Sequence, residues 1–461
     1  MIVRTCDWIA KTTEGKLVGS PVDPYRLIQG VTTDSRKATP GSLFVPLKGE
    51  KFDGHQFLPQ AIQKGIAASL WQEGISLPEQ IPIPLILVKD PLAALQQLAS
   101  RYRQELGIPM IGVTGSNGKT TTKDLIASVL SVKYDVGKTE GNLNNHIGVP
   151  LTLLAMSEKT EVGVVEMGMN HKGEISQLSK LTRPDAAVIT NIGESHLAFF
   201  KSREEIAEAK LEIRDGINGN GFLIINGDEP LLREKTVMAN QQLVKVGFDP
   251  KENDQYPLDI ELQGLQSIQF YTKEKRTRFQ LPILGRHNVL NALFAIEVGR
   301  FFELTDEEIQ RGLANAEITG MRLQIQQAQN GMLIINDAYN ASPTSVRAAL
   351  DLHQELEPQL EKWALLGDVY ELGEQEEKYH REIGAYAMEK QVDRLYTIGK
   401  RGKWIADGAM AAKQNTHCQI QHFDSHDEAS EHLAKEGNQG VSLLVKASRA
   451  MHLDQVVQKL I

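Results

Sequence analysis

One short segment constrains the fold of this chain more than any other. An apolar run at residues 110–113 leads into a glycine-rich turn, and apolar residues recur at helical spacing after Lys119. When a strand passes through such a turn into a helix, free backbone N–H groups and the helix N-terminus point at one anion. The segment therefore predicts a parallel α/β sheet with a phosphate-binding loop, and hence a protein that binds ATP or GTP.

The loop departs from the strict P-loop pattern at one position. That pattern needs a glycine where this chain has Val113, but the surrounding strand, turn and helix signals are present. A chance likeness is the alternative. The residues predicted to hold the nucleotide phosphates are Thr114, Gly115, Ser116, Asn117, Gly118, Lys119, Thr120 and Thr121.

Composition excludes several classes of partner. The net charge of the 461-residue chain is -9 and its basic residues are dispersed, so we expect no nucleic acid partner. No run of about 18 apolar residues occurs, and the first residues do not resemble a signal peptide, so we expect no membrane span. Only Cys6 and Cys418 are present, which favours a reducing, cytoplasmic location.

The chain is predicted to be an α/β protein of three domains. Residues 1–90 form a small α+β module that ends in a strand at 81–88. Residues 91–318 begin with a helix at 91–106 and form a central P-loop ATPase-type domain with a parallel or mixed sheet. Residues 319–461 form a C-terminal Rossmann-like βαβ domain, in which 326–330 is at most a polar turn. Further strands are predicted at 162–165, 186–190, 222–225, 332–335, 363–366, 395–398 and 443–445, and a helix at 345–356.

Two polar residues follow predicted strands of the central domain. Ligands of open α/β sheets bind beyond the carboxyl ends of the strands. Glu166 ends the run at 161–165, where a carboxylate can hold Mg²⁺ beside a phosphate loop, although an exposed strand-end glutamate is the alternative. His196 lies in the turn after the next strand, and a lone histidine is more often structural.

Lys210 occupies an unusual position for a lysine. Ser202 and Glu205 have the spacing of a capping box, and Ile206, Lys210 and Ile213 then fall on one helical stripe. Snorkelling of the ammonium to water is one explanation. The other is that burial lowers the pKa of Lys210 and leaves a reactive neutral amine.

The third domain adds candidates at its junction and after its first strand. Arg322, within Thr319-Gly320-Met321-Arg322-Leu323, is placed to reach a γ-phosphate like an arginine finger, or else is an ordinary surface arginine. Asp337 follows a strand and is placed to accept a ribose hydroxyl. The loop at 339–343 is polar, and a plain turn is its alternative.

Several motifs together resemble the Mur ligases of bacterial cell-wall synthesis. They are the phosphate loop at 112–121, Thr-Asn-Ile-Gly at 190–193 with His196, and His-Asn-Val-Leu-Asn at 287–291, and the resemblance extends over essentially the whole chain. Motifs at 34–36, 47–50, 52–55, 141–145, 337–343, 366–368 and 371–373 resemble the members that join D-alanyl-D-alanine to UDP-N-acetylmuramoyl-tripeptide.

The resemblance implies an ATP-dependent ligase that acts through an acyl phosphate, with two Mg²⁺ ions. It implies that Thr120 and Glu166 bind one Mg²⁺, that Glu166, His196 and Lys210 bind the second, and that Lys210 is carbamylated. It places Asn288 and Asn291 near the adenine, Asp337 near the ribose and Arg322 near the γ-phosphate. The implied catalytic residues are Lys119, Glu166, His196, Lys210 and Arg322.

The resemblance also implies where the peptide substrates bind. The UDP-sugar would contact Ser35, Arg36, Lys48, Gly49, Asp53, Gly54 and His55. The rest of the substrate site would comprise Thr139, Asn142, Asn144 and Asn145, which face the muramoyl-peptide, together with Tyr339, Asn340 and Ser342. The enzyme is expected to act as a monomer.

Three other interpretations stay open at this point. A folylpolyglutamate-synthase-like ligase shares the chemistry but lacks a module resembling residues 1–89. The ligase that adds the third residue of the peptide is expected to have a different loop at 337–343. A nucleotide-binding scaffold without catalysis is disfavoured by the joint presence of the five catalytic candidates.

Overall fold

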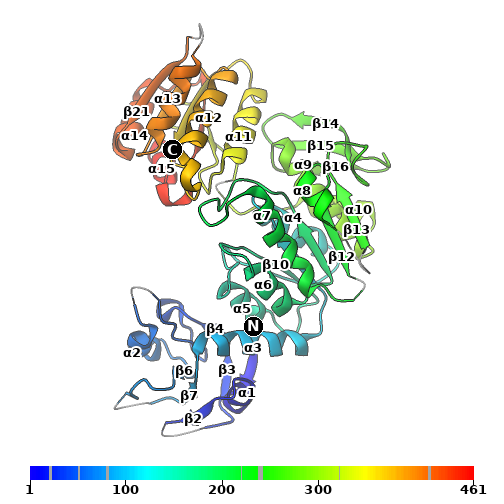
Figure 1. The fold of residues 1–461 in the computed structure, drawn as a ribbon, viewed down its shortest axis with the longest axis vertical. Helices are drawn as coiled ribbons and strands as arrows, with labels where there is room; N and C mark the ends of the chain where they lie inside the picture. Colours follow the sequence, from blue (N-terminus) through cyan, green and yellow to red (C-terminus); the bar gives the residue numbers. More distant parts are fainter. Residues whose placement is uncertain are drawn as a thin grey trace.

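The computed structural model describes residues 1–19, 23–49, 52–78, 82–219, 221–236, 242–320, 322–413 and 417–461. Glu50, Ile81 and Met321, which belong to the patterns above, lie outside these ranges. Figure 1 shows three bodies along the long axis, with the N-terminal module at the bottom and the C-terminal domain at the top. The predicted fold class, an α/β protein of three domains, is confirmed.

The N-terminal module contains two small sheets. One pairs β1 with β3, and the other has the order β2-β7-β6-β5-β4, in which only the β2–β7 pair is antiparallel. Its elements are β1 (Val3–Thr5), α1 (Cys6–Thr12), β2 (Lys16–Val18), β3 (Leu27–Gln29), β4 (Val31–Thr32), η1 (Ser35–Lys37), β5 (Leu43–Phe44), η2 (Gly54–Phe57), α2 (Leu58–Gln63), β6 (Ala68–Gln72) and β7 (Leu85–Val88).

The helix α3 (Pro91–Leu106) has the predicted bounds. Asp90 caps its first turn through the N–H of Leu92 and Ala93, and Gly107 ends it in the left-handed region at φ 62°. The proposed boundary at residues 90/91 therefore falls directly before this helix.

A six-stranded parallel sheet forms the centre of the second domain. Its strand order is β13-β12-β11-β8-β10-β9, so β8 lies between β10 and β11. Because all the strands are parallel, the loops after these three strands meet at one edge of the sheet. The elements are β8 (Met110–Thr114), α4 (Lys119–Leu130), β9 (Val136–Lys138), α5 (Gly148–Ala155), β10 (Val162–Glu166), α6 (Glu174–Thr182), β11 (Ala186–Ile189), α7 (Arg203–Leu211), η3 (Glu212–Gly216), β12 (Phe222–Asn226), α8 (Pro230–Lys235), β13 (Gln242–Val246), α9 (Arg286–Phe301) and α10 (Asp306–Ala314).

Sequence patterns did not predict a second sheet in this domain. The strands β14 (Pro257–Gln263), β15 (Ser267–Thr272) and β16 (Arg278–Leu281) form an antiparallel meander beside α10. Phe270 and Phe279 on its inner face are fully buried. This face completes the apolar core around α9, while the outer face is polar.

The C-terminal domain has a six-stranded sheet of order β17-β18-β22-β19-β20-β21, parallel except for β17. The prediction of a turn at 326–330 is wrong in part, because β17 extends to Gln327 and pairs with β18. An edge strand tolerates this many polar residues because solvent faces it. The elements are β17 (Gln324–Gln327), β18 (Leu333–Asn336), α11 (Pro343–Glu355), β19 (Glu361–Gly367), η4 (Gly373–Gln375), α12 (Glu376–Glu389), β20 (Arg394–Ile398), α13 (Gly402–Ala412), β21 (Gln419–Phe423), α14 (His426–Glu436), β22 (Val441–Lys446), η5 (Arg449–Met451) and α15 (Asp454–Leu460).

The start of the third domain is tied to the helix that follows the phosphate loop. Asp124 on α4 is buried, and its Oδ2 accepts hydrogen bonds from the N–H and the hydroxyl of Thr319, at 3.1 and 2.8 Å. This contact fixes the linker that carries Arg322. None of the helices in the described ranges is both long and apolar enough to cross a membrane.

Candidate active site

The glycines of the phosphate loop are required by space as well as by backbone conformation. Gly115 has φ +149°, and a Cβ there would lie 1.8 Å from the Oγ1 of Thr190. Gly118 has φ +80°, and its Cβ would lie 2.6 Å from the Oδ1 of Asn291. Only glycine lets the loop approach both neighbours this closely.

The loop after β11 holds the phosphate loop in place. The N–H groups of Ser116 and Asn117 donate to the backbone and side-chain oxygens of Asn191, at 3.0 and 2.8 Å. The Lys119 ammonium donates to the carbonyls of Gly115 and Ser116, at 2.8 and 3.3 Å. Burial lowers the pKa of Lys119, and nearby Arg322 lowers it further while Glu166 opposes the shift.

Glu166 ends β10 as a buried carboxylate with one free oxygen. Its Oε1 accepts a hydrogen bond from Asn144 at 2.8 Å, and its N–H donates to the Oγ1 of Thr139 at 3.0 Å. Its Oε2 is buried and has no hydrogen-bond partner among the residues that the structure describes. Such an oxygen is costly unless a cation or a donor reaches it.

The structure places Lys210 in the protein interior. Its side chain on α7 is 1% exposed, and burial lowers its pKa well below the ordinary value, with a smaller contribution from Lys119. The expected burial of this lysine is therefore confirmed, and snorkelling is not what the side chain does. The expected capping box is half formed, because Ser202 accepts from the N–H of Glu205 but the Glu205 carboxylate accepts from Lys201.

His196 meets a residue of the C-terminal domain. Its Nδ1 lies 2.7 Å from the Oε2 of Glu371, which follows β19. Burial lowers the pKa of His196, an effect that the nearby Glu371 carboxylate opposes and Lys210 reinforces.

Arg322 reaches the phosphate loop from the third domain. Its Nη2 donates to the Oγ1 of Thr120 at 3.1 Å, and its guanidinium lies over the ring of Tyr339 at 4.3 Å. Its Nε is buried and has no hydrogen-bond partner in the described ranges. Nearby, Ser342 donates to the Oδ1 of Asn117 at 3.0 Å, which adds a further contact between the two domains.

These residues border one cleft of about 600 Å³ between the central and C-terminal domains. Lys210, Thr139, Thr114 and Gly115 do not line it. They lie in the protein beneath it, where all four are buried. The predicted residues that line the cleft are Ser116, Asn117, Gly118, Lys119, Thr120, Thr121, Asn142, Asn144, Asn145, Glu166, His196, Asn288, Asn291, Arg322, Asp337, Tyr339, Asn340 and Ser342.

The two asparagines expected near the adenine also join two helices. Asn288 donates to the carbonyl of Leu284 at 2.7 Å, and Asn291 donates to the Oδ1 of Asn288 at 2.9 Å. Thr122 of α4 donates to the Oδ1 of Asn291 at 3.2 Å. These bonds fix the N-terminal turns of α9 against α4 at the edge of the cleft.

The structure does not bring the motif residues of the N-terminal module into this cleft. His55 is buried there, with its Nδ1 2.6 Å from Asp53 and its Nε2 accepting from the N–H of Gln72 at 3.3 Å. Ser35 donates to Gln60 at 2.7 Å. Arg36 is exposed and forms an ion pair with Asp34. The predicted substrate residues of this module, all of which lie outside the lining of the cleft, are Ser35, Arg36, Lys48, Gly49, Asp53, Gly54 and His55.

Sequence reasoning gave no role to two residues that the cleft contains. Lys446 ends β22, and its buried ammonium bonds to the carboxylate of Asp337 and to the carbonyl of Asn340. Glu371 belonged to a quoted motif without an assigned role. Both follow strands of the C-terminal sheet, so the rule that led to Glu166 would have found them.

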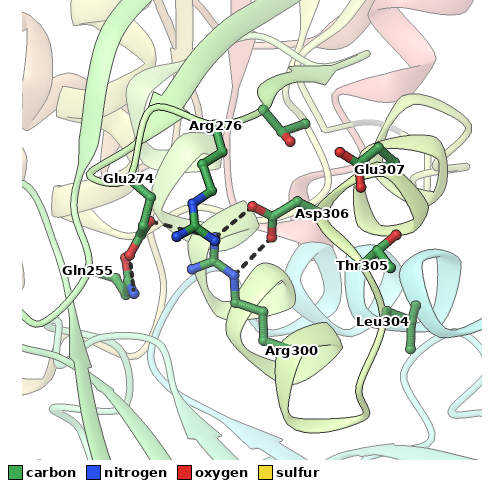
Figure 2. A pocket seen from close by; sticks show the side chains of 9 residues that line it. Gln255, Glu274, Arg276, Arg300, Leu304, Thr305, Asp306 and Glu307 are labelled. Atoms are coloured by element: carbon green, nitrogen blue, oxygen red, sulfur yellow. Dashed lines mark hydrogen bonds and ion pairs between the residues drawn. The ribbon is translucent and has the colours of Figure 1, made fainter.

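A second hollow, of about 540 Å³, lies at the C-terminal end of α9 near the antiparallel meander. Figure 2 shows Arg300 at its centre with Glu274 and Asp306 directed toward the guanidinium. Glu297 adds a third ion pair, so the charge of Arg300 is already neutralised. This network attaches the meander to α9 and α10, and it leaves the Oε1 of Gln255 and the Oε2 of Glu274 buried without hydrogen-bond partners among the described residues.

Comparison with known proteins identifies the family. Three family models match: "Mur ligase family, catalytic domain" over residues 27–103, "Mur ligase middle domain" over 113–299 and "Mur ligase, glutamate ligase domain" over 321–449. A protein of Bacillus subtilis (strain 168) named UDP-N-acetylmuramoyl-tripeptide--D-alanyl-D-alanine ligase is 48% identical over 100% of this chain and 99% of its own. The chain belongs to the Mur ligase family. The expected resemblance is thereby confirmed.

Solved structures of Mur ligases agree in fold. A crystal structure of MurF from Acinetobacter baumannii is 31% identical, covers 100% of this chain and 99% of its own, and has a TM-score of 0.88. MurF ligase from Thermotoga maritima, solved in complex with ADP, is 28% identical over 94% of this chain and 97% of its own, with a TM-score of 0.80. This Mur ligase therefore shares its whole architecture with these proteins.

Proposed function

We propose that this Mur ligase uses ATP to join D-alanyl-D-alanine to UDP-N-acetylmuramoyl-tripeptide, in the cytoplasmic synthesis of peptidoglycan precursors. The observation that carries the proposal is the single cleft where a phosphate-binding loop and a buried carboxylate face an arginine of another domain. The name of the 48% identical relative supports the choice of substrates.

The chemistry explains why ATP is required. An amine does not attack a carboxylate at a useful rate, because the carbonyl is resonance-stabilised and oxide is a poor leaving group. In the proposed reaction a carboxylate oxygen of the tripeptide attacks the γ-phosphorus and ADP leaves, which gives an acyl phosphate. The amine of D-alanyl-D-alanine then attacks the carbonyl carbon, and phosphate leaves as the amide forms and the amine loses a proton.

The first step brings two anions together, and cations of both domains reduce their repulsion. Lys119 lies at the phosphate loop and Arg322 contacts Thr120 at its end. Their charges would stabilise the transferring phosphoryl group. The backbone at 114–121 would hold the phosphates, with Asn288 and Asn291 near the adenine and Asp337 near the ribose.

The residues present fit two Mg²⁺ ions, one held by Thr120 and Glu166 and the other by Glu166, His196 and Lys210. The free Oε2 of Glu166 supports this assignment. No three His, Cys, Asp or Glu side chains within the described ranges gather as a metal site. That agrees with Mg²⁺, which takes one or two carboxylates and completes its shell with phosphate oxygens and water. Bound Mg²⁺ would neutralise charge on the phosphates.

We propose that Lys210 is carbamylated and that the carbamate contributes to the metal site. Only a neutral amine reacts with CO₂, and burial of Lys210 favours the neutral form. The product carries a negative charge, which Lys119 and a bound cation would offset. A buried, positively charged lysine would instead oppose metal binding.

The N-terminal module is proposed to bind the UDP-sugar through Ser35, Arg36, Lys48, Gly49, Asp53, Gly54 and His55. The exposed guanidinium of Arg36 is available for a phosphate oxygen. Thr139, Asn142, Asn144 and Asn145 would face the muramoyl-peptide, and the loop with Tyr339, Asn340 and Ser342 would complete the site. We propose that one chain suffices for activity.

The test is phosphate release from ATP with Mg²⁺ and UDP-N-acetylmuramoyl-tripeptide, with and without D-alanyl-D-alanine, and a mass measurement of the nucleotide product. We expect release to need both substrates and the product to gain the dipeptide less one water. Release that does not depend on the UDP substrate would overturn the proposal and favour a folylpolyglutamate-type ligase. A product that gains one amino acid would indicate the ligase of the third position.

A further inference from the structure

A short segment of the C-terminal domain, Glu371 to Gly373, contacts the loop of His196, and Thr344 donates to Glu194 of the same loop. The Glu371 side chain pairs with His196 Nδ1 at 2.7 Å, and its carbonyl accepts a hydrogen bond from the N–H of Ala198 at 3.0 Å. Glu371 therefore holds this loop through its side chain and its backbone. We call this contact the Glu371 latch.

Backbone conformation shows that the latch is built for close approach. His196 and Glu371 have φ of +69° and +65°, which non-glycine residues rarely adopt. Gly373 has φ +64°, and a Cβ there would lie 3.0 Å from the carbonyl oxygen of Leu197 and 3.2 Å from the Cα of Ala198. A side chain at this position would force the backbone at Leu197 and Ala198 to shift by a few tenths of an ångström.

The latch determines which nitrogen of His196 is available. The Glu371 carboxylate lies 2.7 Å from Nδ1, although the pair does not have the geometry of a hydrogen bond, and the ring leaves Nε2 for a metal. Histidines that bind metals commonly donate their other N–H to a carboxylate, which fixes the ring and raises its basicity. In this chain that carboxylate belongs to a different domain from the histidine.

We propose that Glu371 is a positioning residue that orients His196 from across the domain interface, so that the Mg²⁺ site and the closed arrangement of the domains stabilise each other. This inference rests on the metal role proposed for His196. Because coupling between two equilibria is reciprocal, metal binding must favour the latch by the same factor by which the latch favours metal binding.

The experiment measures Mn²⁺ binding with a non-hydrolysable ATP analogue by electron paramagnetic resonance, without peptide substrates. We expect Glu371→Ala to raise the Mn²⁺ dissociation constant about tenfold. Glu371→Gln should give a smaller increase, because the amide oxygen keeps its place beside Nδ1 but carries no full charge. The control is Glu374→Gln at the exposed residue directly after this segment, and this variant should bind Mn²⁺ like the unmodified chain.

A second variant separates positioning from simple charge. Gly373→Ala changes no charge but disturbs the close approach at Leu197, and we expect it also to weaken Mn²⁺ binding. Small-angle scattering should show that both Glu371→Ala and Gly373→Ala need more Mn²⁺ to reach the compact form. If Gly373→Ala binds Mn²⁺ normally while Glu371→Ala does not, the carboxylate acts by charge alone and the coupling is refuted.

His196→Ala distinguishes failure of this inference from failure of the metal assignment. If His196→Ala binds Mn²⁺ as the unmodified chain does, the metal role of His196 is wrong. If His196→Ala weakens binding and folded Glu371→Ala and Glu371→Gln do not, Glu371 is not a positioning residue. Neither result bears on which peptide substrates the enzyme joins, since none is present.

Discussion

The cleft and the N-terminal module use their motif residues in opposite ways. At the cleft, Glu166 Oε2 and Arg322 Nε are buried without hydrogen-bond partners among the described residues. In the N-terminal module, His55 has partners at both ring nitrogens and Ser35 bonds to Gln60. Buried polar atoms without partners are costly, so proteins keep them where a ligand supplies the missing bond. The comparison shows that the cleft keeps buried polar atoms that a bound ligand would satisfy, whereas His55 and Ser35 are already satisfied within the chain.

The largest effect is expected at the phosphate loop. Lys119→Ala should lower kcat/KM by about 10³-fold, because it removes a cation from the site where charge develops. Steady-state phosphate release measures this. Lys133→Ala, an exposed lysine beyond the other end of α4, is the control and should leave the rate unchanged. If Lys119→Ala has a normal kcat/KM, Lys119 does not stabilise the reacting phosphate, and the functional difference between the cleft and the N-terminal module is refuted.

Burial of Lys210 should make the stability of the folded chain depend on pH. Between the lowered pKa of Lys210 and its ordinary value of 10.5, the unfolded chain binds more protons than the folded chain, so stability rises with pH in that window. In CO₂-free buffer, Lys210→Met should therefore raise Tm at pH 7, by about 2–4 °C for each kcal/mol of desolvation cost removed. The advantage should shrink as the pH approaches 10.5.

Calorimetry of Lys210→Met from pH 7 to pH 10 checks this sign. Lys180→Met replaces an exposed lysine on α6 and should show no such pH-dependent gain. A Tm difference between Lys210→Met and the unmodified chain that stays constant with pH would mean that Lys210 remains protonated in the folded state.

Two glycine-to-alanine variants separate the cost of backbone strain from the loss of nucleotide binding. Gly118→Ala and Gly107→Ala both place alanine at positive φ, which costs roughly 1–2 kcal/mol of stability. Only Gly118 would also drive its Cβ against Asn291, at 2.6 Å, whereas nothing lies within 4 Å at Gly107. We expect both variants to lose stability in urea, but only Gly118→Ala to lose nucleotide affinity in titration calorimetry. Equal nucleotide affinity in the two would contradict the role of the loop.

The smallest effect on stability or activity is expected in the N-terminal module, where the motif residues bond to each other. Asp53 accepts from the N–H and the ring of His55, and these bonds lower its pKa. Its contribution to stability is then present above the ordinary pKa of 3.8 and is lost as the pH falls through the lowered value. Asp53→Ala should cost about 1 kcal/mol near neutral pH, as loss of a helix cap does.

Urea unfolding at pH 7 and pH 3 measures the Asp53→Ala effect. The cost should be smaller at the lower pH. If the variant keeps full stability at pH 7, the bonds between Asp53 and His55 do not stabilise the module. A raised KM for the UDP substrate would support the substrate role proposed for Asp53.

How far the sequence predicted this molecule depended on the kind of pattern. The parallel strands and α3 were predictable because buried strands are continuous apolar runs and Asp90 and Gly107 mark the helix ends. The meander at 257–281 was not, because its strands are short and the alternation of buried and outward residues spans only a few residues in each. Glu166, His196 and Lys210 could be singled out from strand ends and a helical stripe. Their assignments as ligands remain predictions, as do the domain boundaries.

Contacts between domains were beyond any such pattern. Nothing local in the sequence indicates that Glu371 meets His196 or that Asp124 holds Thr319, because each pair is far apart along the chain. Such contacts depend on how the folded domains pack against each other. The periodicity of apolar residues indicates only which face of a helix or strand is buried. Local sequence therefore determines the loops that line the cleft, and packing between the domains determines how these loops meet. For this reason the Glu371 latch could be recognised only in the structure.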